Sequence, residues 1–482
     1  MTSIRHELRP MLALALPLVT AEIGWMLMGL VDTMMVGRLP HAAIAMSSVA
    51  LAQILFNTIA FGLGGILLGL DTVIAQSHGA GKLHAANRWF YHGVLLATGI
   101  AGFLTLVFFL ATLGLARIPA DPTVRSGAVA TLRALNLGIL PLLIYFALRR
   151  YLQAFNHVRP IAAALISANL INLLFNWILI YSHDWHPHLG ISGLHLTIAG
   201  PHLKWTGLGV AGSGLATSLA RAYLAFFLAG SVWFLDRRHR YGLREISLRA
   251  EVALLKSLLQ LGLPAGATIL VEISIFAVVT FLISTLGPVP LAGHEIALNV
   301  ISFTFMIPMG ISAAASVRVG QAIGRRDIPA ARAAGWIALA LSGVVMVAAA
   351  VMYLLIPHAI ARVFTPDEAV IAATVPLFAV AAIFQICDGL QVTVIGALRG
   401  TGDTHSGLIT HLCCYWLIGL PLGVYLAFHS HLGARGLWLG LSLALTLAGC
   451  ILLYRWHRVS RSLTLTRSFP QISPANPRPS RH

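Results

Sequence analysis

The sequence is poor in charged residues. Only 10% of its 482 residues are Asp, Glu, Lys or Arg, whereas about 25% is usual in soluble domains. Hydrophobic residues make up 58%, and the mean hydropathy is +0.83. No gap between the apolar runs is long enough for a soluble domain, and the alternating strands of a membrane β-barrel never give runs of ~20 apolar residues. We therefore predict an all-α integral membrane protein.

Features of several other protein classes are also missing. No Gly-x-x-x-x-Gly-Lys loop occurs, so we expect that ATP does not drive the protein directly. The first apolar run, Met11 to Val36, is too long for the hydrophobic part of a signal peptide. We expect no cofactor, because the few cysteines lie in apolar runs without metal-ligand spacing. These are Cys387, Cys413, Cys414 and Cys450.

The apolar runs have the length that crosses a bilayer. A helix rises 1.5 Å per residue, so about 20 residues span a hydrocarbon core of about 30 Å. We predict twelve spans, at residues 11–37, 44–72, 90–116, 126–148, 160–181, 208–234, 255–286, 291–317, 334–357, 369–396, 407–428 and 435–456.

The charge is strongly asymmetric, with 32 basic residues against 16 acidic ones. If the N-terminus is inside, most Lys and Arg residues fall in cytoplasmic segments, which is the positive-inside pattern. The basic excess is therefore a signal of topology, and we expect no nucleic-acid partner. We predict a multi-pass protein of the cell inner (plasma) membrane with both termini in the cytoplasm.

The two halves of the chain repeat each other. Pro17 matches Pro264 at an offset of 247, and Gln76 and Gly79 match Gln321 and Gly324 at an offset of 245. Six spans in each half mean that both halves insert the same way up, so the repeat is parallel, with its axis along the membrane normal and a cavity between the halves. The predicted units are an N-lobe at 1–234, a cytoplasmic linker at 235–254, a C-lobe at 255–456 and a disordered tail at 457–482.

Three carboxylates lie deep in predicted spans: Asp32, Glu272 and Asp388. An ionised carboxylate at that depth costs about 2.5–3.5 kcal/mol on insertion scales. Pairing with arginine would offset this cost, but only Arg133 and Arg221 fall inside the predicted spans. Intramembrane acids usually mark ion pathways, so we predict that these three bind a coupling cation.

Other polar residues recur at helical spacing near these acids. Asn172 and Asn176 stack one turn apart, either to line a cavity or to form hydrogen bonds between helices. Around Asp388, the spacing predicts one polar and aromatic helix face that includes Phe384, Gln385 and Gln391. For Phe384, packing is the alternative to substrate contact.

Taken together, these motifs resemble the multidrug and toxic compound extrusion (MATE) family, specifically its NorM-type branch, over about residues 8–456. The motifs that carry the resemblance are Val31-Asp32-Thr33 with Gly37, Gln76 with Gly79-Ala80-Gly81, Val271-Glu272 with Phe276, His294 with Ala297-Leu298-Asn299, Gln385 with Asp388 and Gln391, and Leu398-Arg399-Gly400.

The resemblance implies twelve helices in two six-helix bundles around a V-shaped central cavity. It also implies cation-driven antiport of organic cations and drugs, with Glu272 and Asp388 as cation-site acids of the second half and Asp32 as the acid of the first. The sequence departs from the family at Phe384, where relatives often have a tyrosine, and at Glu295, where a glutamine is usual. It gives no role for Glu22 or Asp71.

The leading hypothesis is a monomeric secondary antiporter that exports small organic cations or drugs by alternating access. The coupling ion is either Na⁺, bound between Glu272 and Asp388, or H⁺, since burial favours protonation of a carboxylate. An alternative is a flippase for a lipid-linked or amphipathic substrate, which would favour a basic cavity. A membrane-bound metal enzyme is a weaker alternative, because the histidines of the long outer loop, from His183 to His202, are loosely spaced.

Overall fold

The fold is built almost entirely from long helices. The computed structural model describes residues 2–117, 121–181, 188–191, 194–197 and 207–463. The helices of the N-terminal half are α1 (Thr2–Val36), α2 (Ala42–Gly64), the 3₁₀ turn η1 (Gly65–Leu68), α3 (Gly69–Gly79), α4 (Leu83–Leu115), α5 (Pro122–Asn136), α6 (Ile139–Ala154), α7 (Arg159–Ile180) and α8 (Val210–His239).

The C-terminal half contains α9 (Val252–Ser284), α10 (Pro288–Gly324), α11 (Ile328–Leu355), the short α12 (Pro357–Phe364), α13 (Glu368–Thr401) and α16 (Ala434–Ser462). Between α13 and α16 runs one continuous segment that is partly π-helical. It comprises α14 (His405–His411), the π-helix η2 (Leu412–Gly419), α15 (Leu420–Val424) and the π-helix η3 (Tyr425–His429).

Eleven helices of the described chain are long and apolar enough to cross a membrane, and α5 and α6 together make a twelfth, bent span. This confirms the all-α membrane fold, because a helix is one of the few structures that satisfies its backbone hydrogen bonds within lipid. The fourth predicted span differs, since its two helices meet at 45°. At this bend a Cβ on Gly138 would lie 2.7 Å from the Ser218 hydroxyl, so the glycine lets α8 approach closely.

The ends of the chain also differ from expectation. The segment before residue 11, predicted as a short lead, belongs to α1, and residues 457–462 of the predicted disordered tail belong to α16. Arg332 holds that extension by donating to the main-chain oxygens of Ser460 and Arg461. The rest of the tail lies outside the described residues. So does most of the histidine-rich outer loop, in which β1 (His188–Ile191) and β2 (Leu194–Thr197) form an antiparallel hairpin.

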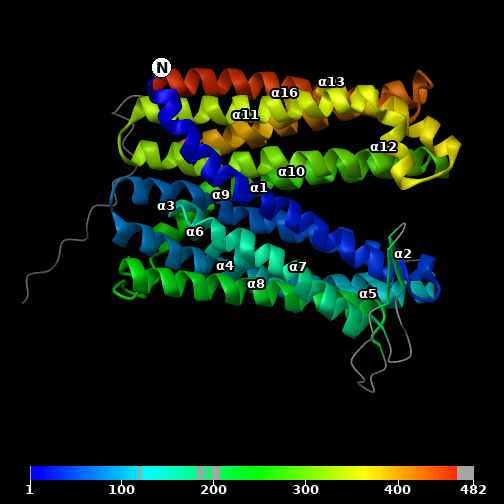
Figure 1. Cartoon of the computed structure of the whole chain (residues 1–482), viewed down its shortest axis with the longest axis horizontal. Coiled ribbons are helices and arrows are strands. Elements are labelled where there is room, and N and C mark those ends of the chain that lie inside the picture. The colour runs from blue at the N-terminus through cyan, green and yellow to red at the C-terminus, as the bar shows by residue number, and fades with distance from the viewer. Residues whose placement is uncertain (1, 118–120, 182–187, 192–193, 198–206, 464–482) are drawn as a thin grey trace, which may run out of the picture.

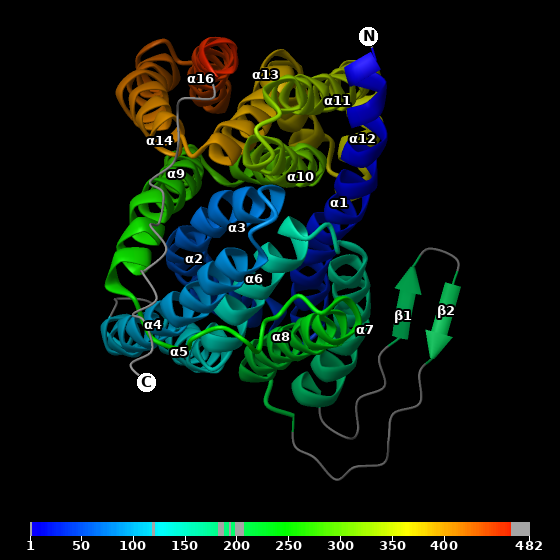
Figure 2. The same cartoon turned by 90° about the vertical axis from the view of Figure 1, so that its left-hand side faces the viewer.

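The two halves lie side by side, with α10, α11, α13 and α16 on one side of the molecule and α4 to α8 on the other (Figure 1). Figure 2 shows α1 and α9 at opposite flanks, each reaching from one half towards the other. Accordingly, α1 packs on α7 of its own half and on α10 of the other, while α9 packs on α2 and η1. Each half therefore contributes its first helix to the other.

The contacts between the halves are reciprocal, as a two-fold axis requires. A Cβ on Gly310 would lie 2.6 Å from the main-chain nitrogen of Val19, and a Cβ on Gly65 would lie 2.8 Å from Cα of Gly266. The repeat offsets of 245 and 247 relate Gly65 to Gly310 and Val19 to Gly266. At these two points backbones meet without side chains between them, which is the packing that small residues permit in membranes.

A second reciprocal set of contacts closes the halves at the end of α3 and α10. Gln76 Nε2 donates to the Gly400 carbonyl at 2.9 Å, and its repeat partner Gln321 donates to the Ala154 carbonyl at 2.8 Å. A Cβ on Gly79 would lie 2.1 Å from the Gln321 carbonyl oxygen. We call these contacts, together with the matching Gly324, the glutamine clasp.

The segment between the halves is fixed to the N-terminal half. The α8 helix ends at His239, and Asn87 Nδ2 donates to the Tyr241 carbonyl at 2.8 Å. Further on, the Tyr91 hydroxyl donates to the Leu248 carbonyl at 2.6 Å, and Arg88 pairs with Glu251. The predicted linker is therefore held against α4 along its length.

We predict that Gly79→Ala and Gly324→Ala open the glutamine clasp. In the present structure, a Cβ at Gly324 would lie 2.1 Å from the Gln76 carbonyl oxygen, whereas carbon contacts need roughly 3.5 Å or more. Spin labels at Lys82 and Arg325, in a background without native cysteines, should move apart in pulsed electron–electron resonance. Gly99→Ala is the control, because a Cβ there meets nothing within 4 Å. Unchanged distances in both clasp variants would show that the lobes do not need this approach.

Candidate functional site

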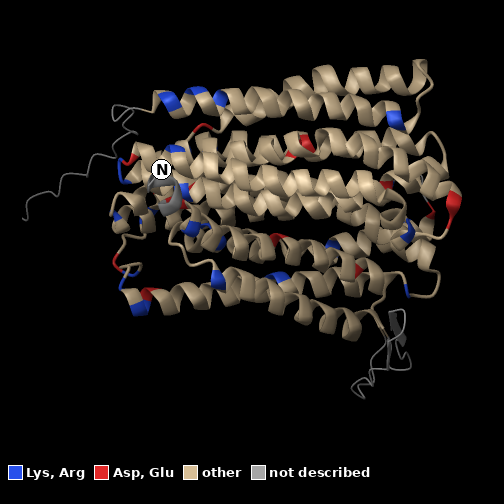
Figure 3. Cartoon of the chain, turned by 45° about the horizontal axis from the view of Figure 1, so that its top comes forward, with Lys and Arg blue, Asp and Glu red and all other residues tan. Residues whose placement is uncertain are grey.

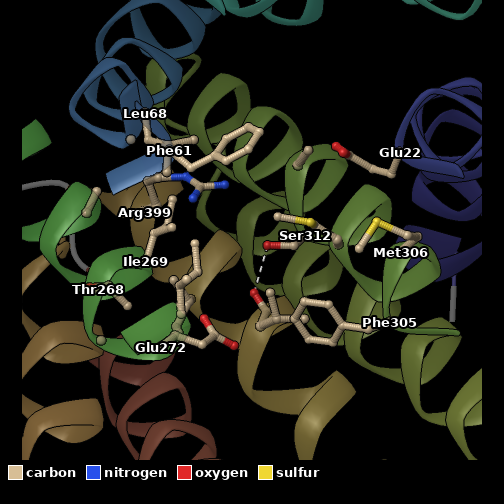
Figure 4. A pocket seen from close by; sticks show the side chains of 18 of the residues that line it. Glu22, Phe61, Leu68, Thr268, Ile269, Glu272, Phe305, Met306, Ser312 and Arg399 are labelled. Carbon is tan, nitrogen blue, oxygen red and sulfur yellow. Dashed lines mark hydrogen bonds between the residues drawn. The ribbon is translucent and has the colours of Figure 1, made fainter. Parts of the chain in front are cut away.

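A cavity of about 490 Å³ lies between the two halves, and its wall is mostly apolar. The N-terminal half contributes Glu22, Trp25, Phe61, Gly64, Gly65, Leu68, Phe146, Arg149 and Arg150. The larger share comes from α9, α10 and α13 and includes Thr268, Ile269, Glu272, Phe276, Phe305, Met306, Ser312, Phe384, Asp388 and Arg399. Figure 4 shows Glu272 and Arg399 on different parts of this wall, with Phe305 and Met306 beside the open space.

One face of α13 forms a continuous strip of the wall. Phe384, Asp388, Val392, Ile395 and Arg399 all line the cavity, and their spacing of three or four residues places them on one side of a helix. Asp388 and Arg399 are about 16 Å apart along the axis. The strip therefore presents an acid near its middle, an apolar stretch, and a base towards the glutamine clasp.

Glu272 on α9 and Asp388 on α13 face this cavity without a basic partner. No Lys, Arg or His in the described part of the chain forms an ion pair with either carboxylate. Asp388 is only 5% exposed, and its one hydrogen bond among the described residues comes from Gln391 Nε2, at 3.2 Å. Two unpaired carboxylates on one wall give the cavity a site that attracts cations.

The other acids of the cavity region are paired. Arg149 donates to Glu22, both of them on the wall. The fully buried Asp71 lies 3.5 Å from Arg150 Nη1 and 3.3 Å from Arg399 Nε. The Arg399 pair crosses from one half to the other, as does the hydrogen bond from the Thr72 hydroxyl to the Arg399 carbonyl, at 2.5 Å.

This pairing corrects the sequence prediction that only Arg133 and Arg221 lie among the spans. The helices continue further than the hydropathy indicated, so Arg149 and Arg150 belong to α6 and Arg399 to α13. All three bases line the cavity. Hydropathy fails here because each arginine stands at the cytoplasmic end of an apolar run, where a charged residue is usually taken as the start of a loop.

Asp32 lies apart from the cavity in a buried cluster of the N-terminal half. Asn176 Nδ2 donates to one carboxylate oxygen at 2.6 Å and the Thr217 hydroxyl to the other at 2.7 Å. Asn176 also donates to Asn172 Oδ1 at 3.0 Å. The structure thus brings together the three predicted residues of this half and adds Thr217 from α8, which no sequence signal had marked.

The structure corrects four of the predicted cavity residues. Asn172 and Asn176 are fully buried beside Asp32, and Gln385 donates to the Thr304 hydroxyl at 2.9 Å, away from the cavity. Gln391 donates to Asp388 and, at 2.6 Å, to the Tyr415 hydroxyl. Residues three apart on a helix diverge by about 60°, so Gln385 and Gln391 flank the cavity strip and face neighbouring helices. Phe384 does line the cavity.

A cavity enclosed by repeat-related halves of a helical membrane protein, with unpaired carboxylates on its wall, defines a membrane transporter. The MatE family model matches residues 17–178 and again residues 264–425. The chain belongs to this family of multidrug and toxic compound extrusion transporters, as the sequence motifs had indicated, and is not an enzyme. The two matches also confirm the internal repeat.

Several known proteins are similar over nearly the whole chain. The probable multidrug resistance protein NorM of Pseudomonas putida is 33% identical over 463 residues, covering 95% of this chain and 96% of that protein. The multidrug resistance protein PmpM of Pseudomonas aeruginosa is 34% identical over 470 residues, covering 95% and 93%. The eukaryotic MATE transporter AtDTX14 has a TM-score of 0.82 at 20% identity, covering 95% of this chain and 98% of its own.

We predict that the Glu22–Arg149 pair stabilises the fold, unlike the unpaired acids. Glu22→Gln leaves a buried guanidinium without its charge partner and should lower the free energy of unfolding by about 2–3 kcal/mol, less than for a fully buried pair because Glu22 borders the cavity. Thermal unfolding in detergent measures this loss, and adding Arg149→Gln should restore most of it. Asp388→Asn is the matched control, which should not destabilise. Equal effects of Glu22→Gln and Asp388→Asn would contradict the distinction.

Proposed function

We propose that this transporter is a secondary antiporter that exports cationic or amphipathic drugs and toxic organic compounds in exchange for Na⁺ or H⁺ by alternating access. The observation that carries the proposal is the pair of unpaired carboxylates, Glu272 and Asp388, on the wall of a mostly apolar central cavity. Such walls accept many apolar compounds, and the carboxylates favour those with a positive charge. The relatives named as multidrug resistance proteins support the same substrate class.

Competition for these carboxylates couples the two transported species. A drug cation is attracted by the ionised side chains. A proton or sodium ion that enters from outside neutralises them, and the drug loses its counter-charge and leaves. Because a charge in an apolar site is costly when unpaired, occupancy by one cation disfavours occupancy by the other. Asp32 is the coupling acid of the N-terminal half, where Asn176 and Thr217 donate to its ionised form.

Alternating access needs two halves that separate at one end and meet at the other. The glutamine clasp and the Asp71–Arg399 pair supply the contacts that hold the halves together at the end of α3 and α10. Opening that end requires the loss of two buried amide hydrogen bonds and one ion pair. These contacts cross between the halves, so a rocking motion of rigid lobes can break them together.

The distribution of basic residues supports an orientation with the clasp towards the cytoplasm. Figure 3 shows Lys and Arg gathered at the end of the molecule that holds the N-terminus, with fewer at the opposite end. We place both termini in the cytoplasm and the protein in the cell inner membrane by the positive-inside rule. The cavity is lined by one chain, which supports a monomer as the working unit.

A flippase for amphipathic lipids is the second candidate, because Arg149, Arg150 and Arg399 line one end of the cavity. A phosphate headgroup would need guanidinium groups that are free to bind it. Here Glu22 and Asp71 already pair with these arginines. The antiporter is therefore the better fit to the charges of the cavity.

We predict that Glu272→Gln and Asp388→Asn each abolish coupled efflux while the protein still inserts and folds. Each substitution keeps the size of the side chain and removes only the charge. Efflux of a fluorescent organic cation from reconstituted vesicles, with sodium and proton gradients imposed separately, should fall to the level of empty vesicles. Glu368→Gln, which removes a side chain 71% exposed at the start of α13, is the control and should transport normally. Wild-type rates in both cavity variants at matched protein density would exclude the proposed coupling site.

A further prediction concerns Phe384, which stands one turn before Asp388 on the cavity wall. A sodium ion is held by several oxygen ligands, and phenylalanine offers none. We expect that Phe384→Tyr increases the sodium stimulation of efflux more than it changes proton-driven efflux. The measurement is efflux in vesicles across sodium concentrations at fixed pH. Identical sodium dependence in variant and wild type would place position 384 outside the cation site.

A further inference from the structure

One short stretch of the chain contacts both acid-bearing helices beside their carboxylates. Tyr415 and Trp416 are neighbours on the π-helix η2. The Tyr415 hydroxyl accepts a hydrogen bond from Gln391 Nε2 at 2.6 Å, and the same nitrogen lies 3.2 Å from Asp388 Oδ1. Trp416 Nε1 donates to the carbonyl of Val271, the residue before Glu272, at 3.4 Å. The π-helix therefore bridges α9 and α13 at the level of both acids.

The sequence accounts for the wide turn at this point. Pro421 has no N–H to give to the carbonyl of Leu417 four residues earlier, so a regular α-helical ladder cannot continue through it. A π-helix makes i to i+5 hydrogen bonds and often occurs at functional sites. It changes the direction in which successive side chains point. Here it directs two adjacent aromatic residues to two different neighbouring helices.

The hydrogen bonds at Tyr415 leave groups unused beside Asp388. Tyr415 is 1% exposed and Gln391 is fully buried. The hydroxyl accepts from Gln391, so its own O–H remains available as a donor. Among the described residues, Gln391 Oε1 has no hydrogen-bond partner. Buried polar groups are nearly always paired, so an unpaired amide oxygen next to a carboxylate indicates a further occupant.

The ring of Tyr415 is held in place from behind. The fully buried His411 stacks on it, with ring centroids 4.7 Å apart and an interplanar angle of 26°. His411 lies one turn earlier on the same span, at the end of α14. With the ring packed on one face and bonded at its hydroxyl, the position of the oxygen is fixed.

We propose that Tyr415 and the Gln391 amide complete the coupling-cation site of Glu272 and Asp388, so that the bound cation contacts the π-helical span directly. The proposal rests on the proposed antiport and extends it to two residues outside the cavity wall. It supplies, from a different helix, the hydroxyl that Phe384 lacks. The ligand is a small monovalent cation, either a proton or a sodium ion.

The same groups serve both cations by changing the atom that they present. When the carboxylates are ionised, the amide N–H and the phenolic O–H donate to them. When a sodium ion or a proton is present, rotation of the amide turns Oε1 towards it, and the Tyr415 oxygen offers a lone pair. No bond to the protein forms or breaks in this exchange. Tyr415 is thus a positioning residue if the cation is a proton, and a ligand if it is sodium.

The test is Tyr415→Phe in the full-length protein, reconstituted in vesicles with a fluorescent organic cation as substrate. We measure the cation concentration that gives half-maximal efflux, with sodium varied at fixed pH and pH varied at fixed sodium. Loss of one hydrogen bond to a charged site corresponds to a change of about tenfold. A sodium site would need about tenfold more sodium, whereas a proton site would need about tenfold less acid, because the ionised carboxylate loses a donor.

The matched control is Tyr425→Phe, on the second π-helix of the same span, where the side chain is 57% exposed. It should leave both half-saturating concentrations unchanged. If Tyr415→Phe lowers only the maximal rate, its role is structural and the proposal is overturned. Gln391→Leu provides the second variant, and its half-saturation must shift in the same direction, or the proposal likewise fails. Retained coupled efflux in Glu272→Gln would instead overturn the antiport itself, so the two failures are distinguishable.

Discussion

The close approach of backbones between the two halves is the constraint on which the rest of the structure depends. Lipid offers no hydrophobic force to press helices together, so packing and polar contacts must hold them. Gly65 and Gly310 let the first helix of each half lie against the second span of the other. The cavity exists because these contacts join the halves along two flanks and leave space between α1, α9, α10 and α13. A side chain at either glycine would displace a helix that lines the cavity.

The two-fold relation explains why the halves share a skeleton but carry different polar groups. Glutamine 76 and Gln321 play the same part on opposite sides of the axis, as do Gly79 and Gly324. The acids follow no such rule. Asp32 lies within the N-terminal half, whereas Glu272 and Asp388 face the shared cavity. Symmetric packing therefore supports motion of the halves, while asymmetric charge decides where each cation binds.

Hydropathy and the repeat were sufficient to predict the helical fold, because twenty-residue apolar runs have few alternatives in a membrane. They were not sufficient for the ends of the helices, where arginines such as Arg149 and Arg399 continue the helix instead of ending it. Periodicity correctly placed Phe384 and Asp388 on one face, but it could not tell the cavity side of α13 from the side that packs on its neighbours. Tyr415 gave no signal at all, since its contact with Gln391 depends on a π-helical turn that shifts every residue around it.

The position of the acids on α13 connects the cavity to the clasp. Asp388 contacts Gln391 and through it Tyr415, and further along the same helix Arg399 pairs with Asp71 of the other half. The next residue, Gly400, accepts the hydrogen bond from Gln76. A helix is stiff along its axis, and the glycines within this one are themselves tightly packed, with a Cβ at Gly396 only 2.2 Å from the Ser312 carbonyl. A change of charge at Asp388 therefore acts on a rod whose far end forms the contact between the halves. Separate elements for binding and for closure would need a further link between them, whereas here a single helix contains both.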